Sequence, residues 1–140
     1  VDAVKLLQFN LLLDYTERVA LAKLPLGTSK EIFSAVQYIR NRTNAQIGID
    51  DVAAAMGKSR SYITKQFRHE TGKSITEFIT ESKLQDAKRL LRYSDKSLAE
   101  IANYLCFSSQ AYFQTVFKNE TGMTPGEYRK RHETSSSGTR

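Results

Sequence analysis

Two short segments of the chain carry hydroxyl, amide and basic side chains at the spacing of one helical face. Serine and threonine bond to base edges or phosphates, glutamine pairs with adenine through two hydrogen bonds, and lysine reaches the acceptors of guanine. The chemistry that these groups indicate is recognition of a nucleic acid. The first face holds Arg60, Ser61, Thr64, Lys65 and Arg68, and the second holds Gln110, Ala111, Gln114, Thr115 and Lys118.

Contacts to phosphates are expected from the starts of the same segments and from their basic side chains. A helix that begins at a serine cap offers free backbone N–H groups to a phosphate. The alternative is that both faces are ordinary solvated surfaces, which would be the commoner arrangement for either helix taken alone. The candidate phosphate-binding residues are Ser59, Arg60, Arg68, Ser108, Ser109 and Lys118.

The two segments occupy equivalent places in a sequence unit that occurs twice. Residues 52–56 match residues 101–105 at an offset of 49, and residues 62–78 match residues 112–128 at an offset of 50. One extra residue has therefore entered the second copy between its two matching parts. Each copy predicts a short helix, a tight turn, a second helix, a stop and the start of a third helix.

Turn and capping residues define the ends of the predicted helices. In the first unit, Gly57 permits a turn with positive φ, Ser59 caps the next helix, and Gly72 ends it. In the second unit, Ser108 or Ser109 is the cap and Gly122 is the stop.

Ser29 is the expected cap of an earlier helix. Capping boxes, in which a Ser or Thr precedes a Glu by three residues, begin at Ser74, Ser97 and Thr124.

A long helix is predicted between the two units, from about residue 75 to residue 93. It would span on the order of 28 Å, slightly less than one turn of duplex DNA at about 34 Å. Small Ala53 and Ala102 allow the helices of each unit to approach closely. The predicted fold is therefore all-α, with two helix-turn-helix subdomains joined by a long linker helix. The polar side of that linker helix is expected to include Lys83, Lys88, Arg89 and Arg92.

The tight turn of the second unit has Cys106 where the first unit has Gly57. Glycine at that place indicates a left-handed backbone, which costs any other residue roughly 1 kcal/mol. Either Cys106 accepts this strain, or the extra residue of the second unit lengthens the turn and removes the need for positive φ. We favour the first alternative.

Several short motifs in both units match those of one family of DNA-binding domains. In the second unit they are Ile101-Ala102, Leu105-Cys106-Phe107, Gln110, Tyr112-Phe113, Val116-Phe117-Lys118, Thr121-Gly122-Met123-Thr124-Pro125 and Glu127-Tyr128-Arg129. In the first unit they are Val52-Ala53, Met56-Gly57, Ser59, Ser61-Tyr62, Phe67 and Thr71-Gly72. Residues 49–131 therefore resemble the DNA-binding domain of AraC/XylS-type bacterial transcription regulators.

The resemblance implies a seven-helix domain that binds double-stranded DNA at an asymmetric promoter site and activates transcription through contact with RNA polymerase in the cytoplasm. Helices 59–70 and 109–120 would enter successive major grooves. Carried over by position, the residues that read bases are Ser61, Thr64 and Lys65 in the first helix and Gln110, Ala111, Gln114 and Thr115 in the second.

Two positions depart from the family pattern. Cys106 stands where the family usually has Gly, and Thr115 stands where the second reading helix often has Arg. Cys106 lies in the tight turn of the second unit, so the first departure bears on the backbone geometry of that turn. The second suggests that the second unit contributes less charge and less base readout than the first.

The chain ends lie outside the repeated units. Residues 2–22 predict an amphipathic helix, apolar nearly all round between Leu6 and Leu13. Residues 1–28 are interpreted as the end of a missing sensor domain or as a homodimer helix, with packing on residues 29–43 as the alternative. The expected DNA-binding domain covers 29–133, divided into 29–73, a linker helix at 74–93, and 97–132, and a disordered tail is expected over 134–140.

Charge and composition favour some kinds of partner and exclude certain kinds of site. Residues 1–57 carry six Lys/Arg and six Asp/Glu, whereas residues 58–140 carry fifteen and nine, so the net charge of +6 lies in the second part. This favours a polyanionic partner. One Cys and two His exclude a zinc-finger ligand set, and no apolar run reaches the ~18 residues of a membrane helix.

No catalytic motif indicates an enzyme, since the chain has no Gly-rich phosphate loop, no Ser/His/Asp grouping and no paired-carboxylate signature. No cofactor and no metal are expected. The alternative function is a helical protein-interaction module of the transcription machinery that does not read bases directly.

Overall fold

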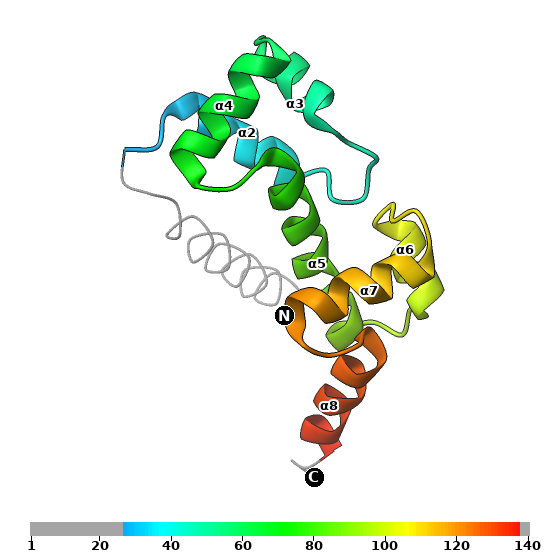
Figure 1. The fold of residues 1–140 in the computed structure, drawn as a ribbon. Helices are drawn as coiled ribbons and strands as arrows, with labels where there is room; N and C mark the ends of the chain where they lie inside the picture. Colours follow the sequence, from blue (N-terminus) through cyan, green and yellow to red (C-terminus); the bar gives the residue numbers. More distant parts are fainter. Residues whose placement is uncertain (1–26, 138–140) are drawn as a thin grey trace, which may run out of the picture.

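The structure is a computed structural model that describes residues 27–137 of the chain. Within this range all regular secondary structure is helical, which confirms the all-α prediction. The helices are α2 (Lys30–Arg40), α3 (Ile49–Met56), α4 (Arg60–Thr71), α5 (Ile75–Tyr93), α6 (Leu98–Tyr104), α7 (Gln110–Thr121) and α8 (Pro125–Ser137) (Figure 1).

Serine caps begin five of the described helices, and the predicted starts are confirmed. At each cap the serine hydroxyl accepts a hydrogen bond from the backbone N–H three residues later. One predicted capping box is complete: Ser97 Oγ accepts from the Glu100 N–H, and the Ser97 N–H donates to Glu100 at 3.2 Å. Hydrogen bonds from the Ser97 N–H and from the Ser97 side chain to the Glu100 carboxylate lower the pKa of that carboxyl. The capping serines are Ser29, Ser59, Ser74, Ser97 and Ser109.

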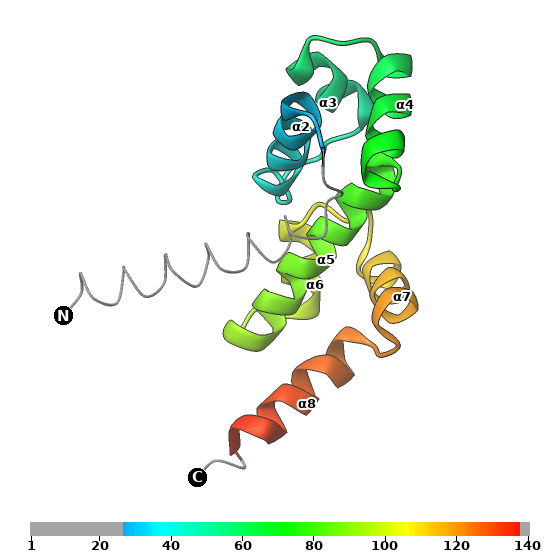
Figure 2. The same cartoon turned by 90° about the vertical axis from the view of Figure 1, so that its left-hand side faces the viewer.

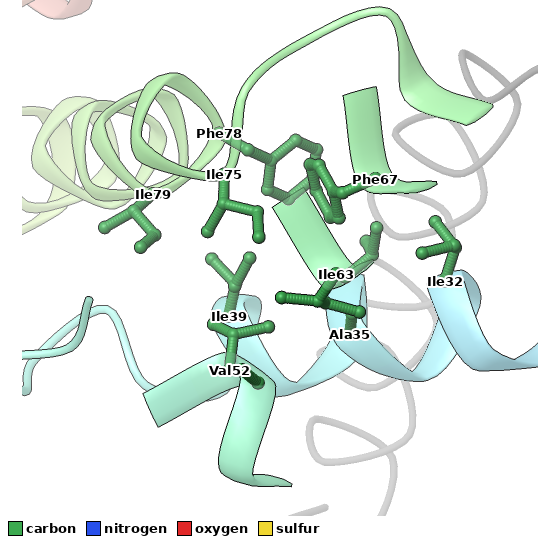
Figure 3. Close-up of a cluster of buried hydrophobic side chains, with 11 residues drawn as sticks. Ile32, Ala35, Ile39, Val52, Ile63, Phe67, Ile75, Phe78 and Ile79 are labelled. Carbon is green, nitrogen blue, oxygen red and sulfur yellow. The ribbon is translucent and has the colours of Figure 1, made fainter. Parts of the chain in front are cut away.

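The apolar side chains form two separate clusters, one for each subdomain. The first lies between α2, α3, α4 and the start of α5, and in it the rings of Phe67 and Phe78 meet edge to face with centroids 5.5 Å apart (Figure 3). The second lies between α6, α7 and the end of α5, and Phe113 and Phe117 are its largest fully buried side chains. Tyr128 of α8 packs against the second cluster.

Helix α5 runs from one cluster to the other and has the predicted bounds (Figures 1 and 2). Phe78 and Ile79 belong to the first cluster, and Leu84 and Leu91 belong to the second. One assignment on this helix was wrong. Lys83 is expected on the polar side, but it is only 7% exposed, because its ammonium reaches backbone carbonyls of other segments.

The end of α5 is held by Arg129 of α8. The guanidinium donates hydrogen bonds to the carbonyls of Leu90, Leu91, Ser94 and Lys96. The last carbonyls of a helix lack partners within the helix, and a cation is favourable beside them. Arg129 therefore caps α5 and fixes α8 against it.

The structure differs from the sequence analysis at the end of the chain. The α8 backbone is helical to Ser137, so residues 134–137 are helical where a disordered tail was expected. Residues 138–140 and the predicted helix 2–22 lie outside the described residues.

The two tight turns have the same backbone conformation. Gly57 has φ 67° and Cys106 has φ 59°, and Cys106 is the one non-glycine residue with positive φ among the described residues. The Lys58 N–H donates to the Ala53 carbonyl in the first turn, and the Phe107 N–H donates to the Ala102 carbonyl in the second. The extra residue of the second unit therefore follows the turn, and the strained alternative for Cys106 is confirmed.

Candidate nucleic-acid interface

The two predicted reading helices, α4 and α7, lie on the same side of α5, and α2 lies on the opposite side (Figure 2). They are built alike. Ser59 and Ser109 cap their first turns, and Gly72 and Gly122 end them with φ values of 79° and 83°. Ile63 and Phe67 in α4, like Phe113 and Phe117 in α7, bury one face and leave the other to solvent.

The outward face of α4 is the more basic of the two. Ser61 and Lys65 are exposed and Thr64 is partly exposed, as expected of residues that read bases. Arg60 forms an exposed ion pair with Asp50 of α3 at 3.2 Å. In the described part of the chain, Lys65 and Arg68 have no acidic partner, so both cations are available to an anion.

The outward face of α7 carries amides and one cation. Gln110 and Ala111 are exposed, and Gln114 is partly exposed. Thr115 is exposed, but its hydroxyl donates to the Ala111 carbonyl of its own helix at 3.0 Å. Lys118 is exposed at the far end of this face. The remaining phosphate-binding candidates, Ser59, Ser108 and Ser109, are exposed at the helix starts.

Two exposed tyrosines that the sequence did not single out as contact residues lie in the first turns of the same helices. Tyr62 of α4 is 44% exposed and Tyr112 of α7 is 52% exposed. The Lys58 ammonium lies 5.3 Å from the Tyr62 ring centroid, and the Phe107 ring lies 6.3 Å from that of Tyr112. A tyrosine hydroxyl is a common partner of DNA phosphates. The signal was present, because the repeat pairs these two aromatic residues at an offset of 50.

The carboxyl end of α4 is tied to the start of α2. Burial raises the pKa of the Glu70 carboxyl, but hydrogen bonds from the Ser29 N–H, from Gln66 and from the Ser29 hydroxyl lower it, and the net pKa lies below its usual value. The bond from the Ser29 N–H is 2.6 Å long. Glu70 thus holds the reading helix against the body of its subdomain.

Two further features are a metal-binding cluster and a membrane-spanning helix, and neither occurs in the part of the chain that the structure describes. The described residues include no group of three or more His, Cys, Asp or Glu side chains that could hold a metal ion. The described helices also include none that is both long enough and apolar enough to cross a membrane.

Comparison with known proteins decides the family. The family described as "Helix-turn-helix domain" matches residues 52–131. The Xylose operon regulatory protein of Escherichia coli K12 is 38% identical over 102 residues, which are 73% of this chain and 26% of that protein. The chain belongs to the AraC/XylS family of transcription regulators. Its relatives are transcription regulators and not enzymes.

Other members of the AraC/XylS family are similar over the same region. An uncharacterized HTH-type transcriptional regulator of Pseudoalteromonas carrageenovora is 40% identical over 97 residues, 69% of this chain and 57% of that protein. The DNA-binding domain of AdpA, solved with a target DNA, has a TM-score of 0.72 at 25% identity and covers 76% of this chain and 96% of that one. The chain thus spans from about a quarter to just over half of these curated relatives.

Proposed function

We propose that this chain binds promoter DNA as a two-part reader, with α4 and α7 in successive major grooves. The observation that carries the proposal is the placement of two equivalent, serine-capped helices on the same side of α5 (Figure 2). The nineteen residues of α5 extend over about 28 Å. That length is close to one duplex turn of about 34 Å, and modest bending of the DNA would close the difference.

Each face supplies the groups that its role requires. On α4, the charge of Lys65 and the hydroxyls of Ser61 and Thr64 would read base edges. On α7, the amides of Gln110 and Gln114 would pair with adenines, while Ala111 and Thr115 would contact thymine methyl groups. The residues proposed to hold phosphates are Ser59, Arg60, Arg68, Ser108, Ser109 and Lys118, together with Tyr62 and Tyr112.

The two subdomains are proposed to contribute unequally. The α4 face presents three basic side chains, Arg60, Lys65 and Arg68, whereas the α7 face presents only Lys118 among the candidate residues. The Thr115 hydroxyl also donates its hydrogen bond to the Ala111 carbonyl within α7. We therefore expect the first half-site to supply more of the binding free energy.

The bound chain is further proposed to act as an activator in the cytoplasm through contact with RNA polymerase. The support for this proposal is the family, whose members include proteins that are named as operon regulators. Residues 1–28, or a sensor domain ahead of them, are proposed to mediate a homodimer. A run-off transcription assay with purified RNA polymerase and a selected site would show added transcript if the chain activates.

The experiment that tests DNA reading is selection of bound sequences from a random duplex pool at low salt. The expected result is an asymmetric pair of enriched half-sites. Gln114→Ala should relax the sequence preference in one of them only, whereas Lys30→Ala, at an exposed position that starts α2, should leave both unchanged. A protein-interaction module would bind the random pool weakly or not at all and would enrich no sequence, which would refute the proposal.

A further inference from the structure

The middle of α5 holds a buried polar junction between the two subdomains. Lys83 stands where the first hydrophobic cluster ends, after Ile79, and the second begins, at Leu84. Its side chain is buried, and the residue is 7% exposed. A buried ammonium is costly unless its donors are satisfied, so the contacts of this group explain why it is tolerated there.

All three donors of the ammonium are used. Lys83 Nζ donates to the carbonyl of Thr43 at 2.6 Å, to that of Ala45 at 2.9 Å and to that of Leu105 at 2.6 Å. Thr43 and Ala45 lie in the segment between α2 and α3, within the first subdomain. Leu105 ends α6 and precedes the strained turn at Cys106, within the second. One side chain on α5 thus connects both subdomains.

Two further bonds surround this group. The Cys106 thiol donates to the carbonyl of Asn44 at 3.4 Å, directly across the two subdomains. The Thr43 hydroxyl donates to the carboxylate of Asp86 on α5. Burial lowers the pKa of Lys83, and the nearby Cys106 and Asp86 raise it in part. We call Thr43, Asn44, Ala45, Lys83, Asp86, Leu105 and Cys106 the junction.

No apolar cluster joins the two subdomains directly, because each cluster packs on its own part of α5. The extensive contacts between helices fall within the first subdomain, within the second, or between α5 and one of them. The two hydrophobic clusters share no residue. Hydrogen bonds are directional, whereas apolar burial is not. The junction links the first subdomain to the second by directional bonds, and it is therefore suited to fix the rotation of the second subdomain.

We propose that Lys83 is a positioning residue that sets the orientation of α7 relative to α4, and so the half-site spacing that the protein accepts on DNA. The proposal rests on the proposed two-part reading of DNA. The link to α7 is short, because the Leu105 carbonyl lies only a few residues before Ser109, which caps that helix. A buried ionic group adds little net stability in general, and in some proteins such a group specifies geometry instead.

The test compares the unmodified chain with Lys83→Met, which keeps the length of the side chain and removes its donors. Lys88→Met makes the same chemical change at a partly exposed position of α5 and is the control. Each is titrated against the selected duplex and against duplexes with about five base pairs inserted between the half-sites, which turn the second groove to the opposite face.

The unmodified chain and Lys88→Met should lose affinity at least about ten-fold on insertion, while Lys83→Met should lose less than about three-fold. Binding to a single half-site should be the same in all three. Equal losses for Lys83→Met and the unmodified chain would overturn the proposal. If no site is selected at all, the proposed function fails instead, and the next measurement tests the junction without DNA.

That second measurement is residual dipolar coupling of backbone amides in the full chain. The unmodified chain should fit one alignment tensor for α2–α4 and α6–α8 together, and Lys83→Met should require two. Two tensors in the unmodified chain would overturn the proposal even if the variant fails to fold. Thr43→Val, which removes only the bond to Asp86, is a milder variant that should shift the tensors in the same direction.

Discussion

Cys106 is under backbone strain that its equivalent, Gly57, does not experience. Its φ of 59° lies in the left-handed region, where a Cβ atom meets the neighbouring carbonyl oxygen. The thiol gains a hydrogen bond to the Asn44 carbonyl, but thiols are weak donors. At this position the cost of the backbone conformation should therefore exceed the benefit of the side chain.

Cys106→Gly is expected to stabilise the protein by several tenths to about 1 kcal/mol. Cys106→Val should destabilise it, because a β-branched side chain resists positive φ. Cys106→Ala is the matched control, since it removes the thiol bond and keeps the Cβ atom, and it should fall below the Gly variant. Urea midpoints would measure all three. A Gly variant less stable than the Ala variant would contradict the strain.

Lys65→Ala should weaken binding to the selected duplex more than Thr115→Ala. A well-placed base contact is worth about 1–3 kcal/mol, and Lys65 is exposed with no acidic partner in the described structure. Thr115 already bonds to its own helix. Dissociation constants at one fixed salt concentration decide the order, with Lys30→Ala as the control. Equal losses would remove the ranking of the two subdomains, and a larger loss for Thr115→Ala would reverse it.

The strain at Cys106 could be predicted from the sequence, and the role of Lys83 could not. The repeat places Cys106 opposite a turn glycine, and such a glycine indicates positive φ. Periodicity, in contrast, assigns any lysine to a polar face. The three carbonyls that accept hydrogen bonds from the Lys83 ammonium belong to residues 22 to 40 positions away in the sequence. No local sequence pattern could therefore predict these contacts.

At the scale of elements, Glu70 joins two helices of the first subdomain. Its carboxylate accepts from the N–H and the hydroxyl of Ser29, the residue that caps α2, and from the amide of Gln66. The orphan N–H groups at the start of α2 thereby gain an anion from α4. These bonds outweigh the effect of burial and lower the pKa of Glu70 below its ordinary value of 4.5.

A lowered pKa of a carboxyl in the folded state gives stability that is full above pH 4.5 and is lost as the pH falls through the folded value. Glu70→Gln should therefore reduce stability at pH 7 by about 1 kcal/mol or less, because the carboxylate is still partly exposed to solvent, which screens its interactions. The difference should vanish in acid. Urea midpoints at both pH values would show this, with exposed Glu120→Gln as the control. A difference that persists in acid would exclude the charge as its cause.

Most helix boundaries followed from local signals. Serine caps and left-handed glycines predicted α4, α5 and α7 within a residue or so, because both devices act within one turn of the chain. The end of α8 was misplaced, since residues 134–137 offer no apolar periodicity to continue the pattern. Arg129 was also matched only as part of a motif, because the carbonyls that it binds belong to α5 and the segment after it.

At the scale of the whole molecule, charge should dominate the affinity for DNA. The net charge of +6 lies in residues 58–140, which include both reading helices. If about six phosphates are neutralised, the slope of the logarithm of the binding constant against the logarithm of salt concentration should be near −5. A titration of the full chain on one duplex gives the slope. A slope shallower than about −2 would indicate that the chain does not follow the groove.

The same-side placement of α4 and α7 is the central claim that the repeat and the linker helix led us to expect (Figure 2). It is tested most directly by methylation protection on the selected duplex, because guanine N7 lies in the major groove. The account predicts two protected clusters about 10 base pairs apart on one face of the DNA, with Lys65→Ala weakening one cluster and Gln114→Ala the other. A single protected cluster, or two clusters on opposite faces, would contradict it.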